Sequence, residues 1–452
     1  MSIPTPDFLA ILSESGMPSH AGRDRPFRIR TRLDTSPSAL RSLSTVAAGE
    51  GKDPIPLKTM LGGFLGWIPL LFEPLADWYI PPIQPQARLR PENRPWQEII
   101  TGVYGVPPLL KIHDRNSVVK WSFERDDVKQ HLPPNLKRCL HSRANDATDI
   151  KWMRNGTSVA AIYSDLALVV NHTPDNPETD KLITFAVCRD NEFLHNAHTV
   201  EALPGSLLAV GTTGQRPWDG ILVYNASLEN PLIDDPPILQ NITGLRAIHA
   251  MIWDEQAQML WATGTDAAAD GSDPIPAYGV IQGYPFDAAT GQLRKDDAYV
   301  YRLPTAWDID SEWGTGNSWW AGPHDLVPVP NQRKFIISND RGLFAFDIEL
   351  GQYTESYEEV TNKYMKGFEV TTNDRHGINR AGQYEELPMS DLKGFNLAPD
   401  GSFIYVQSLW QKYRAFHISL VVNGVRRKIC KGDEIYRSRW WGEIDGWPKP
   451  KT

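Results

Sequence analysis

His249-Ala-Met-Ile-Trp-Asp-Glu-Gln-Ala-Gln-Met-Leu-Trp-Ala262 is one of five related segments in this sequence. Each segment begins with a polar residue, alternates between polar and apolar residues, turns at a residue such as Asn, Gly, Pro or Asp, and continues as an apolar strand. A period of two with turn residues between the runs is typical of paired β-strands. The other four segments begin at Asp149, His198, His324 and Lys393.

The spacing of these hairpins indicates a repeat architecture. Their starts lie 49, 51, 75 and 69 residues apart, and a four-stranded propeller blade takes roughly 40–50 residues. The two longer intervals hold insertions, such as 266–274 and 305–321, or a further blade. A β-sandwich would not repeat one hairpin five times. We therefore predict an all-β protein with a single β-propeller, seven-bladed, with six blades as the alternative.

The closing of the ring is also predicted by the sequence. Residues 435–441 begin another inner strand, yet only eleven residues follow Trp441. Partner strands must come from elsewhere, and residues 107–124 can supply them. Strands from both chain ends then close the ring and remove its free sheet edges. The propeller domain is expected at 98–452, after an N-terminal extension at 1–97 that is Pro-rich and partly disordered.

Composition excludes some partners. The 452 residues carry 46 Lys and Arg against 55 Asp and Glu, a net charge of −9, and no basic block is present, so nucleic acid is not expected as a partner. The apolar run at 60–72 is shorter than the ~20 residues of a transmembrane helix. We expect no transmembrane segment, and a monomer.

The compartment is less clearly marked. Residues 1–20 lack a basic segment followed by an apolar one, so no cleavable signal is visible. Three cysteines without metal-ligand spacing fit either an extracellular or a cytoplasmic location. Four Asn-x-Ser/Thr sequons would be acceptors for glycans in a secreted protein. They begin at Asn155, Asn171, Asn225 and Asn241.

The first strand of a propeller blade lines the central channel, so its opening residue faces the channel mouth. Three histidines occupy that position in consecutive repeats: His198, His249 and His324. Imidazoles arranged in this way bind a metal, or move protons on an anionic substrate. Cationic neighbours attract an anion and repel a metal, which favours the second chemistry. The other expected mouth residues are Asp149, Lys393 and, in the closing blade, Arg437 or Arg439.

Further candidates come from outside the inner strands. Phenols near strand ends are candidate bases, and tryptophans can stack on a sugar. Arg216 lies in a loop that can reach over the mouth, and His195 lies in a loop at the rim of the mouth. Ordinary packing or a solvated loop is the competing interpretation for each of them. The phenols are Tyr278, Tyr284 and Tyr436, and the tryptophans are Trp218, Trp319 and Trp320.

At these residues a resemblance can be stated. The histidine-led hairpins, the strand Trp261-Ala-Thr-Gly264, the run Gly322-Pro-His-Asp-Leu326 and the closing segment Ile435-Tyr-Arg-Ser-Arg-Trp-Trp441 resemble the β-propeller polysaccharide lyases. The similarity is to the fungal rhamnose–glucuronate lyases and, more distantly, to ulvan lyases. It covers about residues 149–441 and rests on repeat phase and histidine placement.

The resemblance implies a seven-bladed propeller that cleaves a glycosidic bond next to glucuronate by β-elimination. It implies a uronic-acid-containing glycan as partner, an extracellular location, and no required cofactor, although a divalent metal in the channel is compatible with it. The missing signal and the long N-terminal extension depart from that family and leave a cytoplasmic location as the alternative. The resemblance implies catalytic roles for His198 and His249 and then His324. Together with the residues singled out above, the expected catalytic residues are His198, His249, His324 and Tyr278, and the expected substrate-binding ones are Asp149, Arg216, Lys393, Tyr436 and Arg439; no residue is assigned to a metal.

Two other functions stay open. One is a non-catalytic propeller that binds a carbohydrate or a protein at the same mouth, since a fold does not determine a function. The other is a metal-dependent propeller hydrolase of the lactonase kind. That enzyme needs carboxylate and Asn ligands at the inner-strand starts, and among the five starts only Asp149 fits.

Overall fold

The structure is a computed structural model whose contacts divide the chain into two units, residues 1–83 and 84–452. All described residues belong to the second unit, so the expected extension lies outside them except for Gln97. The described residues are 97–105, 107–142, 146–188, 194, 196–213, 218–266, 277–307, 309–312, 323–339, 342–370, 376–379, 384–386, 392–408 and 414–450.

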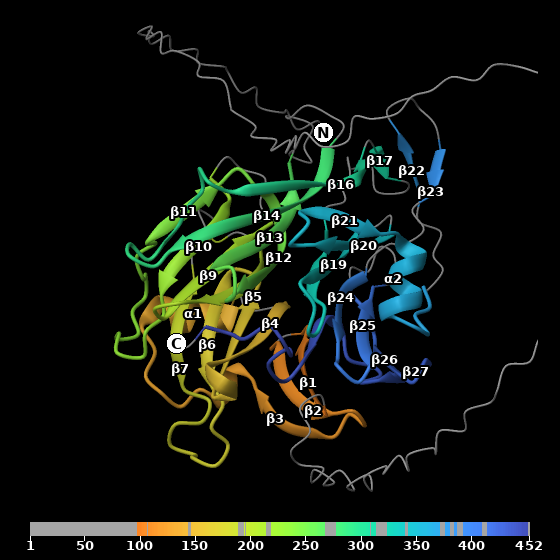
Figure 1. The fold of residues 1–452 in the computed structure, drawn as a ribbon. Coiled ribbons are helices and arrows are strands. Elements are labelled where there is room, and N and C mark those ends of the chain that lie inside the picture. Colours follow the sequence, from red (N-terminus) through yellow and green to blue (C-terminus); the bar gives the residue numbers. More distant parts are fainter. Residues whose placement is uncertain are drawn as a thin grey trace, which may run out of the picture. The chain divides into compact units, whose positions relative to one another are not determined.

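The described strands form six blades in a ring (Figure 1). The innermost strand of each blade contacts the innermost strand of the next, and the sixth contacts the first, so the ring is closed. The protein is therefore a six-bladed β-propeller, and the alternative of six blades is confirmed whereas the expectation of seven is wrong. The two long intervals hold insertions instead of a blade. β16 (Tyr299–Trp307) adds an extra strand beside β14 (Ala277–Asp287), and a separate sheet has the strand order β17 (Ile309–Glu312), β22 (His376–Asn379), β23 (Tyr384–Glu386).

Each blade is an antiparallel sheet whose strands follow one another from the channel outward. Blade 1 is β28 (Ile435–Trp440), β1 (Glu98–Val103), β2 (Leu109–Asp114) and β3 (Val119–Phe123). Blade 2 is β4 (Ala147–Met153), β5 (Ser158–Tyr163), β6 (Leu166–Asn171) and β7 (Ile183–Cys188). Blade 3 is β8 (Ala197–Leu203), β9 (Leu207–Thr212), β10 (Gly220–Asn225) and β11 (Gln240–Thr243).

Blade 4 is β12 (Arg246–Asp254), β13 (Met259–Thr265), β14 (Ala277–Asp287) and β15 (Gln292–Leu293). Blade 5 is β18 (Asp325–Pro328), β19 (Lys334–Asn339), β20 (Gly342–Asp347) and β21 (Gln352–Glu355). Blade 6 is β24 (Leu392–Leu397), β25 (Phe403–Gln407), β26 (Ile418–Val422) and β27 (Val425–Ile429).

The chain closes the ring by pairing its last described strand with its first. β28 runs antiparallel to β1, with Thr101 opposite Ser438 and Ile99 opposite Trp440. The side chains of Thr101 and Ser438 also hydrogen-bond, with their oxygens 3.1 Å apart. The predicted closure by both chain ends is thus present, although the partner strands begin at Glu98 and not at residue 107.

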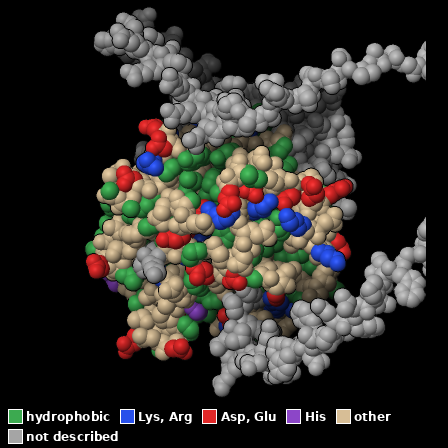
Figure 2. Space-filling model, viewed as in Figure 1, with side chains coloured by type: hydrophobic (Ala, Val, Ile, Leu, Met, Phe, Trp, Pro, Cys, Tyr) green, Lys and Arg blue, Asp and Glu red, His purple; other side chains and the backbone are tan. Residues whose placement is uncertain are grey.

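The core lies between neighbouring blades. Apolar side chains on the facing sides of blades 2 and 3 form one cluster, with Val169, Phe185 and Leu208 among its buried members, and equivalent clusters fill the other interfaces. Because each strand exposes alternate residues to its two neighbours, both faces of a blade are apolar. The strands therefore consist of nearly continuous hydrophobic runs. On the face seen in Figure 2, acidic and basic side chains lie interspersed among polar and apolar ones.

Two α-helices accompany the blades within the described part of the chain, α1 (Pro134–Ser142) and α2 (Tyr357–Tyr364). A disulfide joins Cys139 in α1 to Cys188 at the end of β7, with their Cα atoms 6.3 Å apart. Among the described residues, no helix has the length and apolar composition needed to cross a membrane.

Candidate functional site

Five side chains from five blades meet at one end of the channel. We call them the mouth ring: His198, His249, His324, Lys393 and Tyr436. The ring centroids of His198 and His249 are 5.0 Å apart, as are those of His249 and His324. The phenol of Tyr436 lies 5.3 Å from His198. The Nζ atom of Lys393 lies 3.5 Å from Nε2 of His324 and 5.5 Å from the centre of the Tyr436 ring. The predicted convergence of the three histidines with Lys393 and Tyr436 is therefore found.

Local backbone irregularities orient these side chains. The pairing of the inner strand shifts by a bulge at the ring position in β8, β12, β24 and β28, and also in β4. A bulge turns a side chain out of the regular alternation, here toward the channel axis. In β24 the residue after Lys393 is Gly394, and a Cβ atom there would lie 3.0 Å from Cγ of Arg437. Any larger residue at this position would push the Arg437 side chain away by a few tenths of an ångström, so the glycine allows the close approach of the two strands.

Two of the ring histidines, His198 and His249, each make an equivalent local hydrogen bond that determines the tautomer of the imidazole. Asn196 and Ala247 adopt left-handed φ angles of 52° and 50°. Their carbonyl oxygens lie 3.0 Å and 2.8 Å from Nδ1 of His198 and His249, two residues further on. A carbonyl only accepts hydrogen bonds, so in both rings Nδ1 carries the hydrogen and Nε2 carries the lone pair.

The same two imidazoles are neutral at neutral pH. Burial lowers the pKa of His198 to about 3, and the charges of Arg437 and Lys393 act in the same direction. Burial likewise lowers the pKa of His249 well below its ordinary value, with the neighbouring histidines adding to the effect. His249 and His324 are almost completely buried, whereas His198 is half-buried. A ligand entering the mouth therefore reaches His198 more easily than the other two.

Beneath the mouth ring lies the buried guanidinium of Arg437, one residue after Tyr436. Its Nη atoms donate to the backbone carbonyls of His198, His249 and His324 at 3.1, 3.0 and 2.7 Å. Its Nε donates to the carbonyl of Lys393 at 3.2 Å. One side chain thus holds the backbone of four ring residues from four blades. Sequence analysis offered Arg437 only as an alternative to Arg439.

Asp149 and Arg439 lie below the ring, in what we call the ion-pair layer: Asp149, Lys151, Glu201, Asp325 and Arg439. Arg439 donates from Nη2 to Asp149 at 3.1 Å and to Asp325 at 3.2 Å. Lys151 donates to Glu201 at 2.6 Å. The sequence pattern predicts Asp149 and Arg439 at the mouth, whereas the structure places both of them below the mouth ring. The bulge in β4 falls at Thr148, as the bulge in β8 falls at His198, so Thr148 and not Asp149 takes the equivalent position. The hydroxyl of Thr148 donates to the carbonyl of Ala197 at 2.9 Å.

Charges in the ion-pair layer compensate one another. Burial alone would raise the pKa of Asp149, but Arg439, Lys151 and Arg437 outweigh it and hold that pKa well below its ordinary value. Burial lowers the pKa of Lys151 to about 8, although Glu201 opposes the shift. Both members of each pair therefore stay charged near neutral pH, which is how buried ion pairs persist.

Three further predicted residues that the structure describes are not among the mouth-ring side chains. Tyr278 lies on β14, two strands outward from β12, and its ring packs against the guanidinium of Arg302 at 5.2 Å. Tyr284 is buried in the core between blades 3 and 4, and this burial raises the pKa of its phenol. Trp218 is exposed, and its carbonyl accepts from Asn241. Arg216, His195, Trp319 and Trp320 lie outside the described residues.

The mouth ring has one aromatic neighbour that the sequence pattern did not predict. Tyr104, just after β1, stacks on Tyr436 with centroids 5.9 Å apart and planes 4° from parallel. The guanidinium of Arg414 covers the ring of Tyr104 at 5.2 Å and pairs with Glu434. Tyr104 lies outside the five repeats, and Arg414 lies between β25 and β26 of blade 6, away from its inner strand. The phase of the inner strands therefore could not reveal either residue.

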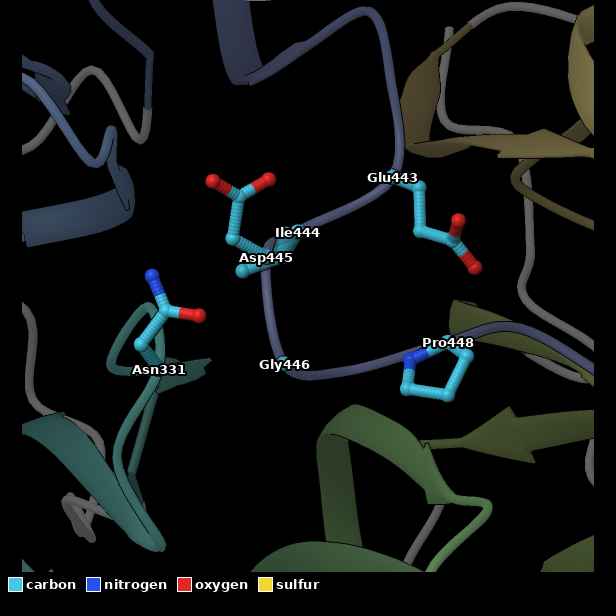
Figure 3. A pocket seen from close by; sticks show the side chains of 6 residues that line it. All are labelled: Asn331, Glu443, Ile444, Asp445, Gly446 and Pro448. Carbon is cyan, nitrogen blue, oxygen red and sulfur yellow. The ribbon is translucent and has the colours of Figure 1, made fainter.

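The other end of the channel is covered by residues 441–450, which we call the C-terminal strap. Trp447 packs on Phe335 with centroids 5.0 Å apart, and its Nε1 donates to the carbonyl of Val329 at 3.0 Å. The ammonium of Lys449 pairs with Glu201 of the ion-pair layer. A pocket of about 340 Å³ lies beside the strap, and Figure 3 shows Asn331 and Asp445 on one side of it and Glu443 on the other. Because the strap covers this end of the channel, we expect a ligand to reach the histidines from the end at which the mouth ring lies.

Within the described parts of the chain, no group of three or more His, Cys, Asp or Glu side chains is arranged to hold a metal ion. The Nδ1 atoms of two ring histidines already bond to carbonyls, and Nε2 of His324 faces the ammonium of Lys393. Asp149, the carboxylate that a propeller hydrolase would use, is paired with Arg439.

No family model matches the sequence, and no curated protein matches it either. Among solved structures, hydrazine synthase from Kuenenia stuttgartiensis is similar to this chain with a TM-score of 0.37 and 12% sequence identity, over 71% of this chain and 77% of that chain. A similarity at this level assigns no activity to the chain.

Proposed function

We propose that the mouth ring binds the carboxylate of a uronic acid residue in a glycan and cleaves the adjacent glycosidic bond by β-elimination. The observation that supports this proposal is the composition of the ring. It joins an ammonium, three imidazoles and a phenol within contact distance of one another. An ammonium can neutralise a carboxylate, and imidazoles and phenols can move protons.

In the proposed reaction, Lys393 pairs with the substrate carboxylate and so makes the hydrogen on C5 more acidic. A base removes that proton, the C4–O bond breaks, a C4–C5 double bond forms, and an acid protonates the departing oxygen. His198 is our candidate base because it is the most exposed ring imidazole and its Nε2 carries a lone pair. Tyr436, in edge contact with His198, is the candidate acid.

The low pKa of free His198 is consistent with this role only when the substrate is bound. A base is most effective when its pKa lies near the working pH. The charges of Lys393 and Arg437 contribute to the low value. A carboxylate that pairs with Lys393 offsets that positive charge and raises the pKa of the imidazole toward neutrality.

The experiment follows the absorbance of unsaturated uronate during incubation with gum arabic and other glucuronic-acid-containing glycans. We expect a rise with the wild-type protein. The double variant His198→Gln/His249→Gln should lose at least about 100-fold in rate. The matched control is His131→Gln, since His131 is an exposed histidine before α1. No rise with any uronate glycan, or an unchanged rate in the double variant, would overturn the proposal.

The same samples distinguish a non-catalytic binder. Calorimetric titration with glucuronate oligosaccharides measures binding independently of turnover. Binding without product that survives the double substitution indicates a carbohydrate-binding propeller. An activity that depends on added divalent metal and is lost with a chelator indicates the hydrolase alternative.

A further inference from the structure

We propose that Asn155, Asn225 and Asn241 are N-glycosylation sites, and that the fourth sequon, at Asn171, stays unmodified. This inference does not depend on the proposed lyase activity. Its basis is the place of each sequon in the propeller, together with the disulfide between Cys139 and Cys188.

The four sequons differ in exposure. Asn155 is exposed in the turn between β4 and β5, where it has a left-handed φ of 54°. Asn225 is exposed at the end of β10, and Asn241 is exposed on β11, the outermost strand of blade 3. A glycan is bulky and hydrophilic and requires a surface position. All three asparagines meet that requirement.

Asn171 differs from these three. Its side chain is half-buried at the end of β6. The loop that follows folds back on it: the backbone of Lys181 donates to the carbonyl of Asn171, and Nδ2 of Asn171 donates to the carbonyl of Thr179 at 3.2 Å. Nδ2 of Asn241 also donates one bond, to Trp218, but a glycosylated amide keeps one hydrogen. Burial under the loop, and not the hydrogen bond, distinguishes Asn171.

The accepting sites lie away from the mouth ring. In blades 2 and 3 the inner strand begins at the mouth, so the β4–β5 turn and the end of β10 belong to the opposite end of the blade. Asn241 lies on a sheet edge, where a glycan would also prevent pairing with another chain. Glycans at these positions leave the histidines accessible.

The disulfide is an independent observation that points to the same compartment. Disulfides persist in oxidising environments such as the secretory pathway and are rare in the cytosol. Cys139 and Cys188 bridge α1 and β7 of blade 2, the blade that also contains Asn155. N-linked glycans are added in that pathway.

The chemistry needs one further reactant, an oligosaccharide linked through a diphosphate to a lipid carrier. Nδ2 of the asparagine forms a bond to C1 of the first sugar, and the C1–oxygen bond to the diphosphate breaks. One amide proton is released, and the lipid diphosphate leaves with the bonding electrons. No oxidant or reductant is consumed.

The test uses the full-length chain made through the secretory pathway of a eukaryotic cell. Glycans are removed with an amidase in heavy-oxygen water, which converts each occupied Asn to labelled Asp, and peptides are mapped without reduction. We expect label at Asn155, Asn225 and Asn241, none at Asn171, and one linked peptide containing Cys139 and Cys188. The proposal would be overturned by full-length secreted protein in which one or more of the three sites carries no label, or in which Asn171 is labelled.

Variants assign the glycans to sites. Each of Asn155→Gln, Asn225→Gln and Asn241→Gln should remove one glycan from the intact mass. Thr157→Ala should act like Asn155→Gln while leaving the asparagine in place, which separates loss of the sequon from a folding defect. Asn230→Gln is the matched control, because Asn230 is an exposed asparagine followed by Pro231 and should leave the mass of the glycans unchanged.

Discussion

The mouth ring and the ion-pair layer are built from the same inner strands, yet they accommodate buried polar groups in opposite ways. In the ion-pair layer, Arg439 binds Asp149 and Asp325, and Lys151 binds Glu201. In the mouth ring, burial keeps His198 and His249 neutral. Lys393 there contacts an imidazole and a phenol.

This difference separates stability from ligand binding along one channel. Removing one partner of a buried ion pair leaves an uncompensated charge and costs about 3–5 kcal/mol. Losing a contact between a cation and a neutral ring costs less, since such contacts are worth about 0.5–2 kcal/mol. Substitutions in the ion-pair layer and at Arg437, which lies between that layer and the mouth ring, should therefore affect folding most strongly. Substitutions in the mouth ring should affect ligand binding most strongly.

The largest effect is expected for Arg437→Met. It removes the buried guanidinium that binds four carbonyls and approaches Asp149 to 3.4 Å. We expect the free energy of unfolding to fall by about 5 kcal/mol, measured by denaturant titration. Arg437→Lys should recover only part of it, because an ammonium cannot reach all four carbonyls. The control Arg294→Met, at an exposed pair with Asp297, should change stability by less than about 1 kcal/mol; equal losses in both variants would refute the role of Arg437.

Asp149→Asn should rank second, at about 3 kcal/mol, since it leaves Arg439 with Asp325 and weakens the contact to Arg437. The same denaturant titration measures it. If Asp149→Asn proved neutral while Arg437→Met was destabilising, the stabilising role would belong to the carbonyl contacts of Arg437 and not to the ion pairs.

Acid should affect the two regions in different pH windows. The folded pKa of His198 is about 3 against an ordinary 6.5, so the unfolded chain binds the proton more readily, and stability falls as the pH decreases from 6.5 toward 3. The pKa of Asp149 is lowered from an ordinary 3.8, so its stabilisation is present above pH 3.8 and is lost as the pH falls through the folded pKa.

Unfolding curves of wild type and His198→Gln between pH 7 and pH 4.5 test the first window. The variant should show a weaker dependence on pH there. His113 and His417 also have lowered pKa values, so only the difference between the two proteins is assigned to His198. Parallel curves would show that the imidazole does not titrate as described.

Lys393→Met should have the smallest effect on folding and a large effect on the ligand. We expect the free energy of unfolding to fall by about 2 kcal/mol at most, because the contacts of the Lys393 ammonium include His324 and the Tyr436 ring, and contacts between a cation and a neutral ring are worth about 0.5–2 kcal/mol. Affinity for glucuronate oligosaccharides should fall at least about tenfold, which corresponds to a loss of ~1.4 kcal/mol in binding. Calorimetry measures the binding, and unchanged affinity would remove Lys393 from the ligand site.

Repeat phase was sufficient to predict the part of the site that repeats. His198, His249 and His324 stand at one position of three consecutive hairpins, and the fold brings equal positions together around one axis. In blade 2 the predicted phase was wrong by one residue, since Thr148 and not Asp149 lies at the bulge that corresponds to the ring position. It also failed for Tyr104, which belongs to no repeat, and for Arg414, which lies in blade 6 but not on its inner strand.

Blade number was overestimated for a related reason. The long intervals before His324 and Lys393 contain β16, α2 and the separate sheet of β17, β22 and β23. Length and strand-like alternation do not distinguish an inserted sheet from a blade, since the distinction depends on which strand reaches the axis. That information is in the contacts between inner strands.

The pairing of β28 with β1 has a consequence for synthesis. Thr101 and Ser438 are 337 positions apart, so a ribosome must deliver blades 2 to 6 before blade 1 receives its inner strand. Until then β1 has an open edge that can pair with another nascent chain. Contacts this distant in sequence also form slowly. Ring closure therefore has to wait for the synthesis of β28, and a chain that stalls before Ile435 leaves the other blades around an incomplete first one.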